Sequence, residues 1–129
     1  MSIEISIIEG PLPQEPQPWT ADGTGAIVCF EGVVRGTEND RSIEALDYDV
    51  YDPMATRQLT RLAQSLCEQH GLMAVRVLHS RGRVPVGQCS FRLQIASKHR
   101  KEAIRAMDEF IDQLKQDIPI WKKAVFAGE

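Results

Sequence analysis

The pattern of hydrophobic and polar residues predicts strands in six segments of the chain. The clearest lies at 88–97, where every second residue from Cys89 to Ile95 is apolar, as in a strand with one buried face. Alternation or β-branched runs predict the others, at 3–9, 24–34, 42–51, 73–80 and 120–126. The proline-rich segment 10–19 is predicted to be a loop.

Two segments have apolar residues at helical spacing instead. The first, 53–70, follows Asp52 as a candidate N-cap and ends before Gly71. The second, 98–117, follows Ser97 as a candidate N-cap, and Pro119 ends it because the residue before a proline avoids the helical region. Its predicted buried stripe consists of Ala103, Met107, Phe110, Ile111, Leu114 and Ile118.

The order of these elements is β-β-β-α-β-β-α-β, without strict alternation of strands and helices. This order favours an α+β fold, with a mostly antiparallel sheet packed against two main helices. A length of 129 residues suits a single domain over 1–129.

Composition then excludes several classes of function. Hydrophobic residues make up 43% of the chain, with no apolar run near the roughly 20 residues that span a bilayer, so we expect a soluble protein. The N-terminus lacks a basic stretch before an apolar core, which favours the cytoplasm. A net charge of −3 argues against nucleic-acid binding, and the three dispersed cysteines do not have the spacing of a zinc site.

Basic residues are nevertheless concentrated late in the chain. The predicted first turn of the second helix contains Lys98, His99, Arg100 and Lys101, although a helix N-terminus favours negative charge. Two interpretations stay open. Either an anion binds there with His99 and Arg100 as ligands, or the turn is a solvated basic surface.

Three further lysines follow. Lys115 lies in the predicted last helical turn, where the helix dipole alone could explain a cation. Lys122 and Lys123 are neighbours in an extended segment, so their side chains point to opposite faces. If Trp121 faces the core, Lys123 points inward with it, and the pattern alone does not decide which lysine could serve as a base or nucleophile.

Four segments together resemble a known family. They are "GAIVCFEGVVRG", "ALDYDVYDPMA", "ASKHRKEAI" and "LKQDIPIWKK", and they are similar in order and spacing to motifs of the large, catalytic subunit of molybdopterin synthase, the MoaE family. Each motif alone is a weak signal, whereas four in register are a strong one. The resemblance extends from about Gly25 to Lys123.

The resemblance implies an α/β-hammerhead fold and a homodimer of large subunits. Each large subunit would bind a small ubiquitin-like, MoaD-like sulfur carrier, which gives a heterotetramer. The activity implied is a sulfurtransferase of molybdenum cofactor biosynthesis, which moves sulfur from the carrier's C-terminal thiocarboxylate to cyclic pyranopterin monophosphate. Neither a metal nor a cofactor is implied for this step.

The same resemblance implies the site residues. Lys115 would be the principal catalytic residue and Lys122 the second, while substrate binding would involve Val33, Val34, Arg35, His99, Arg100, Lys115, Lys122, Lys123 and Ala124. Lys123 is expected to be a neighbour more than a catalyst, and some of these residues would reach the site across the dimer interface.

Two positions depart from the family pattern. Ser80 stands where an arginine is common, and Gln113 where an aromatic residue is common. Two alternative functions stay open. The acidic balance and the missing aromatic residue favour a non-catalytic module that binds a ubiquitin-like partner, and the second alternative is an anion-binding domain for phosphorylated metabolites.

Overall fold

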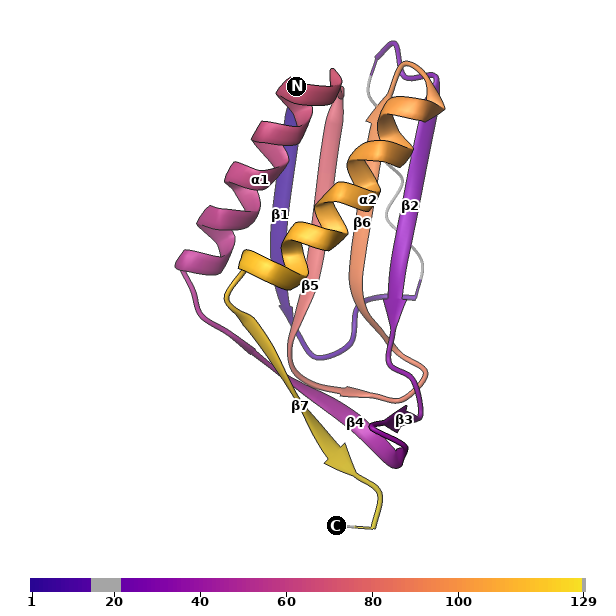
Figure 1. The fold of residues 1–129 in the computed structure, drawn as a ribbon, viewed down its shortest axis with the longest axis vertical. Coiled ribbons are helices and arrows are strands. Elements are labelled where there is room, and N and C mark those ends of the chain that lie inside the picture. The colour runs from indigo at the N-terminus through magenta and orange to yellow at the C-terminus, as the bar shows by residue number, and fades with distance from the viewer. Residues whose placement is uncertain (15–21, 129) are drawn as a thin grey trace.

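The computed structural model describes residues 1–14 and 22–128, and part of the predicted loop at 10–19 lies outside them. The described residues form one sheet, and two helices cover one of its faces (Figure 1). The elements are β1 (Ser2–Glu9), β2 (Ala26–Val33), β3 (Thr37–Glu38), β4 (Arg41–Val50), α1 (Met54–His70), β5 (Ala74–Pro85), β6 (Cys89–Ser97), α2 (Arg100–Asp117) and β7 (Ile120–Phe126). No helix in this part of the chain is long and apolar enough to cross a membrane.

The sheet has the strand order β2-β6-β5-β4-β3, with β1 beside β5 and β7 beside β4. Among the described strands only the β1–β5 pairing is parallel, so the predicted α+β class with a mostly antiparallel sheet is confirmed. Strand β2 pairs with β6 and not with β4, the next long strand along the chain. The hairpin in this region joins β3 and β4 through Asn39 and Asp40, whose φ angles of 51° and 62° suit a two-residue turn.

Strand β5 extends five residues beyond the end of the predicted strand at 73–80. Its first half pairs with β1 and β6, and its end, from Gly82 to Pro85, pairs with β4. Gly82 has a φ of 80°, and a Cβ there would lie 2.7 Å from Glu9 Oε1. A glycine is therefore needed where β5 passes from one part of the sheet to the other.

The main core lies between the sheet and the two helices. Its centre is formed by Leu59, Leu66, Val77, Leu93 and Phe110, each at most 2% exposed. Of the predicted stripe on α2, Ala103, Met107 and Phe110 are buried, while Ile111, Leu114 and Ile118 are partly buried against the same core.

A smaller cluster lies where β4 meets β7. It consists of Val34, Ile43, Leu46 and Val84, with Tyr48, Ala124 and Phe126 packed against it. This cluster connects the residue after β2, Val34, to strand β7, through Ala124 and Phe126.

Both helices begin later than predicted. Helix α1 starts at Met54 with Pro53 as its N-cap, so the prediction of Asp52 as the N-cap is wrong by one residue. Asp52 Oδ1 nevertheless accepts the Thr56 N–H at 3.0 Å and satisfies one donor of the first turn. Helix α2 starts at Arg100, because Ser97 is the last residue of β6, paired with Ala26, and is not the N-cap.

Candidate functional site

Helix α2 begins beside the start of β2, at the upper end of the sheet in Figure 1. The Gly25 N–H donates to the Ser97 carbonyl at 3.0 Å, and a Cβ on Gly25 would lie 2.2 Å from the Lys98 carbonyl oxygen. Only glycine permits this approach of two backbones, which fixes the position of Lys98 and of the residues that follow it.

The charge mismatch predicted at the start of α2 is smaller in the structure. His99 has extended backbone angles and is the N-cap, so only Arg100 and Lys101 are cations of the first turn. Glu102 also lies in that turn, and its carboxylate accepts the His99 N–H at 3.2 Å. Glu102 therefore offsets part of the unfavourable charge. His99 and Arg100 are both exposed.

Lys115 is exposed in the last turn of α2, as predicted. The helix ends at Asp117, and Ile118 is extended, so the prediction that Pro119 ends the helix is confirmed. The turn is held by two backbone hydrogen bonds, from Tyr51 N–H to the Pro119 carbonyl at 3.1 Å and from Ile120 N–H to the Ile118 carbonyl at 2.8 Å. Strand β7 then carries Lys122 back along β4.

The register of β7 distinguishes its two lysines. Lys122 lies opposite Tyr48 and shares a face with Ile120 and Ala124, which pack against the two hydrophobic clusters. Lys123 shares the other face with Trp121, which is 58% exposed, so the condition that Trp121 faces the core is wrong. Lys122 is therefore the lysine on the inner face.

Lys122 lies among polar groups that the sequence pattern does not assign to a site. Its Nζ is 3.7 Å from Glu38 Oε1. On the facing strand, the Tyr48 hydroxyl lies 2.9 Å from Ser90 Oγ, and the Tyr48 ring packs edge-on against the ring of His79 at 5.2 Å. Burial raises the pKa of Tyr48 and lowers that of His79, so both are neutral at pH 7. The alternation of Leu46, Tyr48 and Val50 was the signal that places Tyr48 on the inner face.

A groove of about 480 Å³ follows this pair of strands. It is lined by Asp47, Tyr48, Asp49, Trp121, Lys122 and Lys123. Lys122 and Lys123 therefore both line this groove, although their side chains lie on opposite faces of β7.

The structure brings together residues of three of the four motif segments, because Leu46 and Tyr48 of β4 lie at the same place. Val34 is buried in the smaller hydrophobic cluster and Ala124 packs against that cluster, so the segments Val33–Arg35 and Lys122–Ala124 meet there. Arg35 is exposed, and Glu38, three residues later, makes the contact with Lys122.

The structure does not bring His99 and Arg100 to that place within one chain. Fifteen helical residues separate Arg100 from Lys115, which is roughly 22 Å along the axis of α2. Strand β2 separates the start of α2 from Arg35 by roughly 25 Å or more. In Figure 1 the start of α2 and strand β7 accordingly lie at opposite ends of the molecule.

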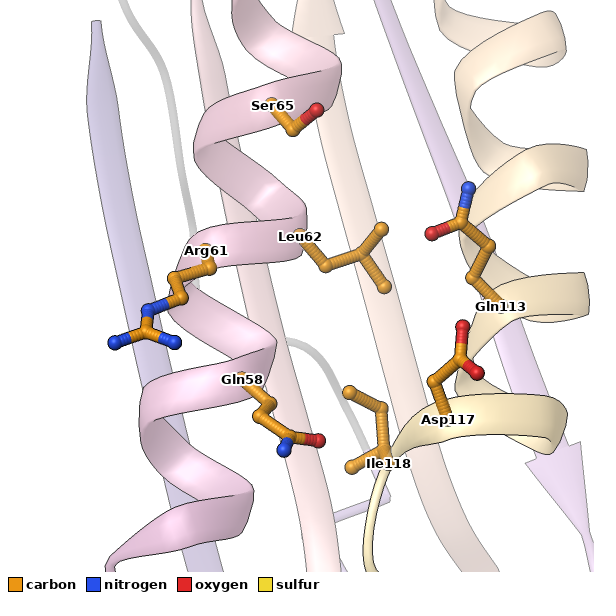
Figure 2. Close-up of a pocket in the computed structure, with 7 residues that line it drawn as sticks. All are labelled: Gln58, Arg61, Leu62, Ser65, Gln113, Asp117 and Ile118. Atoms are coloured by element: carbon orange, nitrogen blue, oxygen red, sulfur yellow. The ribbon is translucent and has the colours of Figure 1, made fainter.

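A second cleft, of about 510 Å³, lies between α1 and α2 (Figure 2). Gln58, Leu62, Gln113 and Asp117 point toward it from the two helices. Lys115 is two residues from Gln113, or about 200° around the helix, so it lies away from this cleft. We therefore place the candidate site at β7 and not between the helices.

The two departures from the family pattern lie outside the β7 groove. Ser80 is fully buried, and its hydroxyl has no hydrogen-bond partner among the described residues. Arg81 donates to the Val50 carbonyl at 3.3 Å, and Gln113 faces α1. No group of His, Cys, Asp or Glu side chains in the described residues could hold a metal ion.

Comparison with known proteins identifies the family. Residues 12–117 match the model of the family described as "MoaE protein". The chain is 35% identical over 105 residues to the molybdopterin synthase catalytic subunit of Neurospora crassa. The match covers 81% of this chain and 51% of that protein, so the chain spans about half the length of this relative.

Two solved structures agree with this assignment. Molybdopterin synthase from Staphylococcus aureus superposes with a TM-score of 0.85 at 28% identity, covering 95% of this chain and 91% of the other. The complex of subunits 1 and 2 of molybdopterin-converting factor from Helicobacter pylori contains a chain with a TM-score of 0.73 at 27% identity, covering 97% of this chain and 90% of the other. The chain therefore belongs to the MoaE protein family.

Proposed function

We propose that this chain is the catalytic subunit of a molybdopterin synthase and that it works in the cytoplasm. It transfers sulfur from the C-terminal thiocarboxylate of a small ubiquitin-like subunit to cyclic pyranopterin monophosphate. The observation that carries the proposal is that Val34 and Ala124 lie at one hydrophobic cluster, while the register of β7 puts Lys122 on the inner face opposite Tyr48. The relative named as a molybdopterin synthase catalytic subunit and the solved structure named as a molybdopterin synthase support the same activity.

The proposed sulfur transfer depends more on positively charged side chains than on a nucleophilic side chain of this protein. The thiocarboxylate sulfur attacks an electrophilic carbon of the pterin side chain and displaces an oxygen substituent, which leaves with a proton. Water then cleaves the acyl–sulfur bond, which leaves sulfur on the pterin and a carboxylate on the carrier tail. An ammonium group stabilises the negative charge that develops on the acyl oxygen, and it can also donate a proton. Lys115 takes this role, and Lys122 binds the tail in the groove.

The cysteines of this chain are poor candidates for the sulfur donor. Cys29, Cys67 and Cys89 are all free thiols, and burial raises the pKa of each. They are therefore protonated at pH 7, whereas a thiolate is the reactive form. An external donor fits this chain better, and the Helicobacter pylori relative is a complex of two subunits.

The anionic substrate would be bound by Arg35, His99 and Arg100 together. Because strand β2 separates the start of α2 from Arg35 by roughly 25 Å, one chain does not bring these groups to one substrate. A homodimer solves this when His99 and Arg100 of one chain join Arg35, Lys115 and Lys122 of the other. With one carrier on each chain, the assembly is a heterotetramer.

Reconstitution tests the proposal. The purified chain, a thiocarboxylated small subunit and the cyclic pterin are expected to yield molybdopterin, with Lys122→Ala reducing kcat/KM about 100-fold. Lys123→Ala is the matched control, expected to lose at least about tenfold less because it points to the other face of β7.

Two results would contradict this account. Binding of the small subunit without any turnover would favour the non-catalytic binding module. Equal losses of kcat/KM in Lys122→Ala and Lys123→Ala would mean that the two lysines have the same role, although they lie on opposite faces of β7.

A further inference from the structure

The side chain of Tyr48 is held by residues of two other strands. Its hydroxyl lies 2.9 Å from Ser90 Oγ of β6, and its ring packs edge-on against the ring of His79 of β5. In the sheet, β5 lies between β4 and β6, so the Tyr48 side chain reaches across β5 to Ser90. It therefore ties β4 to the main part of the sheet.

The two residues that hold Tyr48 are themselves fixed. His79 is buried, and its Nδ1–H donates to the Ser80 carbonyl at 2.8 Å. The His79 ring also packs against the ring of Phe91 at 5.7 Å. Ser90 is buried as well. Contacts with two buried and fixed side chains give the Tyr48 ring a defined orientation.

The hydroxyl of Tyr48 is not needed to fill space. The ring packs against the smaller hydrophobic cluster, and a phenylalanine ring would fill the same volume there. Burying a phenol hydroxyl costs free energy unless it is hydrogen-bonded. What the hydrogen bond to Ser90 adds is a fixed direction for the ring.

Lys122 lies directly opposite this fixed ring. In the antiparallel pairing of β4 with β7 the two residues share the inner face, with Cβ atoms about 5 Å apart. The ammonium group lies 3.7 Å from Glu38 Oε1, and the lysine side chain is 54% exposed. Ion pairs this exposed contribute little, so Glu38 alone does not fix the lysine. The tyrosine ring beside the aliphatic stem of Lys122 is the more rigid support.

We infer that Tyr48 is a positioning residue for Lys122. Its ring, fixed by Ser90 and His79, supports the stem of Lys122 and directs the ammonium group into the groove of about 480 Å³, where the carboxylate of the carrier tail binds. The inference rests on the proposed function, because that function gives Lys122 its role in binding the tail. Tyr48 acts only through Lys122, and this dependence separates its role from a contribution to stability alone.

A double-mutant cycle tests this dependence. Calorimetric titration with the small ubiquitin-like subunit in its plain carboxylate form measures binding of the tail without turnover. Tyr48→Phe and Ser90→Ala remove the same hydrogen bond from its two ends, and each is expected to raise the Kd about threefold. Lys122→Ala is expected to raise it about tenfold. Added to Lys122→Ala, the other two substitutions are expected to leave the Kd unchanged, because no ammonium group remains to be positioned.

Two controls separate positioning from stability. Tyr51→Phe makes the same chemical change at an exposed tyrosine and is expected to leave the Kd unchanged. Urea unfolding is expected to show the same loss of stability from Tyr48→Phe whether or not Lys122 is present. Ser90→Ala keeps the tyrosine ring, so the cycle can be completed even when Tyr48→Phe does not fold.

The outcomes of the cycle are distinct. An equal rise in Kd with and without Lys122, or no rise from either Tyr48→Phe or Ser90→Ala, would overturn the inference. Binding that follows the expected pattern in a chain that transfers no sulfur would support the positioning role and count against the proposed function alone.

Discussion

Replacing Lys115 by alanine is expected to lower the rate of molybdopterin formation at least about 100-fold, which is the usual cost of removing one group that stabilises charge in a transition state. Lys115 is exposed, so the variant should fold and dimerise normally. Single-turnover assays with the thiocarboxylated small subunit measure the chemical step directly, and Gln116→Ala serves as a control on the same helical turn.

The result that would contradict this role is unchanged product formation by Lys115→Ala. A loss confined to KM would instead mean that Lys115 binds substrate equally in the ground state and the transition state.

The largest effect on stability is expected at Glu31. Arg92 is 1% exposed, and its Nε and Nη2 donate to Glu31 Oε2 at 2.9 and 2.6 Å, with a further bond from Nη2 to the Pro13 carbonyl. Glu31→Ala leaves a buried guanidinium without its counter-charge, which costs about 3 kcal/mol of unfolding free energy. Urea unfolding at a fixed protein concentration measures this loss.

Glu44→Ala is the matched control for this prediction. Glu44 pairs with Arg83 at 3.1 Å on the surface, where both side chains are largely exposed. Such a pair contributes about 0.5 kcal/mol. Similar losses in the two variants would mean that the burial of Arg92 does not set the strength of its ion pair.

Local sequence signals predicted the helices and most strands well. The apolar spacing and the stop at Gly71 located α1 to within one residue, and Pro119 located the end of α2. The start of α2 was misplaced, because Ser97 has the chemistry of an N-cap yet pairs with Ala26 in the sheet. The long-range pairing of Ser97 with Ala26 therefore outweighed the local preference of serine for an N-cap position, and it moved the start of α2.

The arrangement of the site was less predictable. The pairing of β4 with β7 depends on contacts between residues far apart in the chain, which alternation alone does not specify. This pairing decides which lysine of β7 points inward, and it brings Tyr48 and Glu38 to Lys122. The distance between His99 and Lys122 likewise follows only from the lengths of α2 and β2.

The central claim is that two chains share each site, and mixing two inactive variants tests it most directly. One variant carries His99→Ala with Arg100→Ala, and the other carries Lys115→Ala with Lys122→Ala. Co-expressed chains that pair at random form mixed dimers half of the time, and each mixed dimer has one intact site, so about a quarter of wild-type activity is expected. Activity no higher than that of the separate variants would contradict a site shared between two chains.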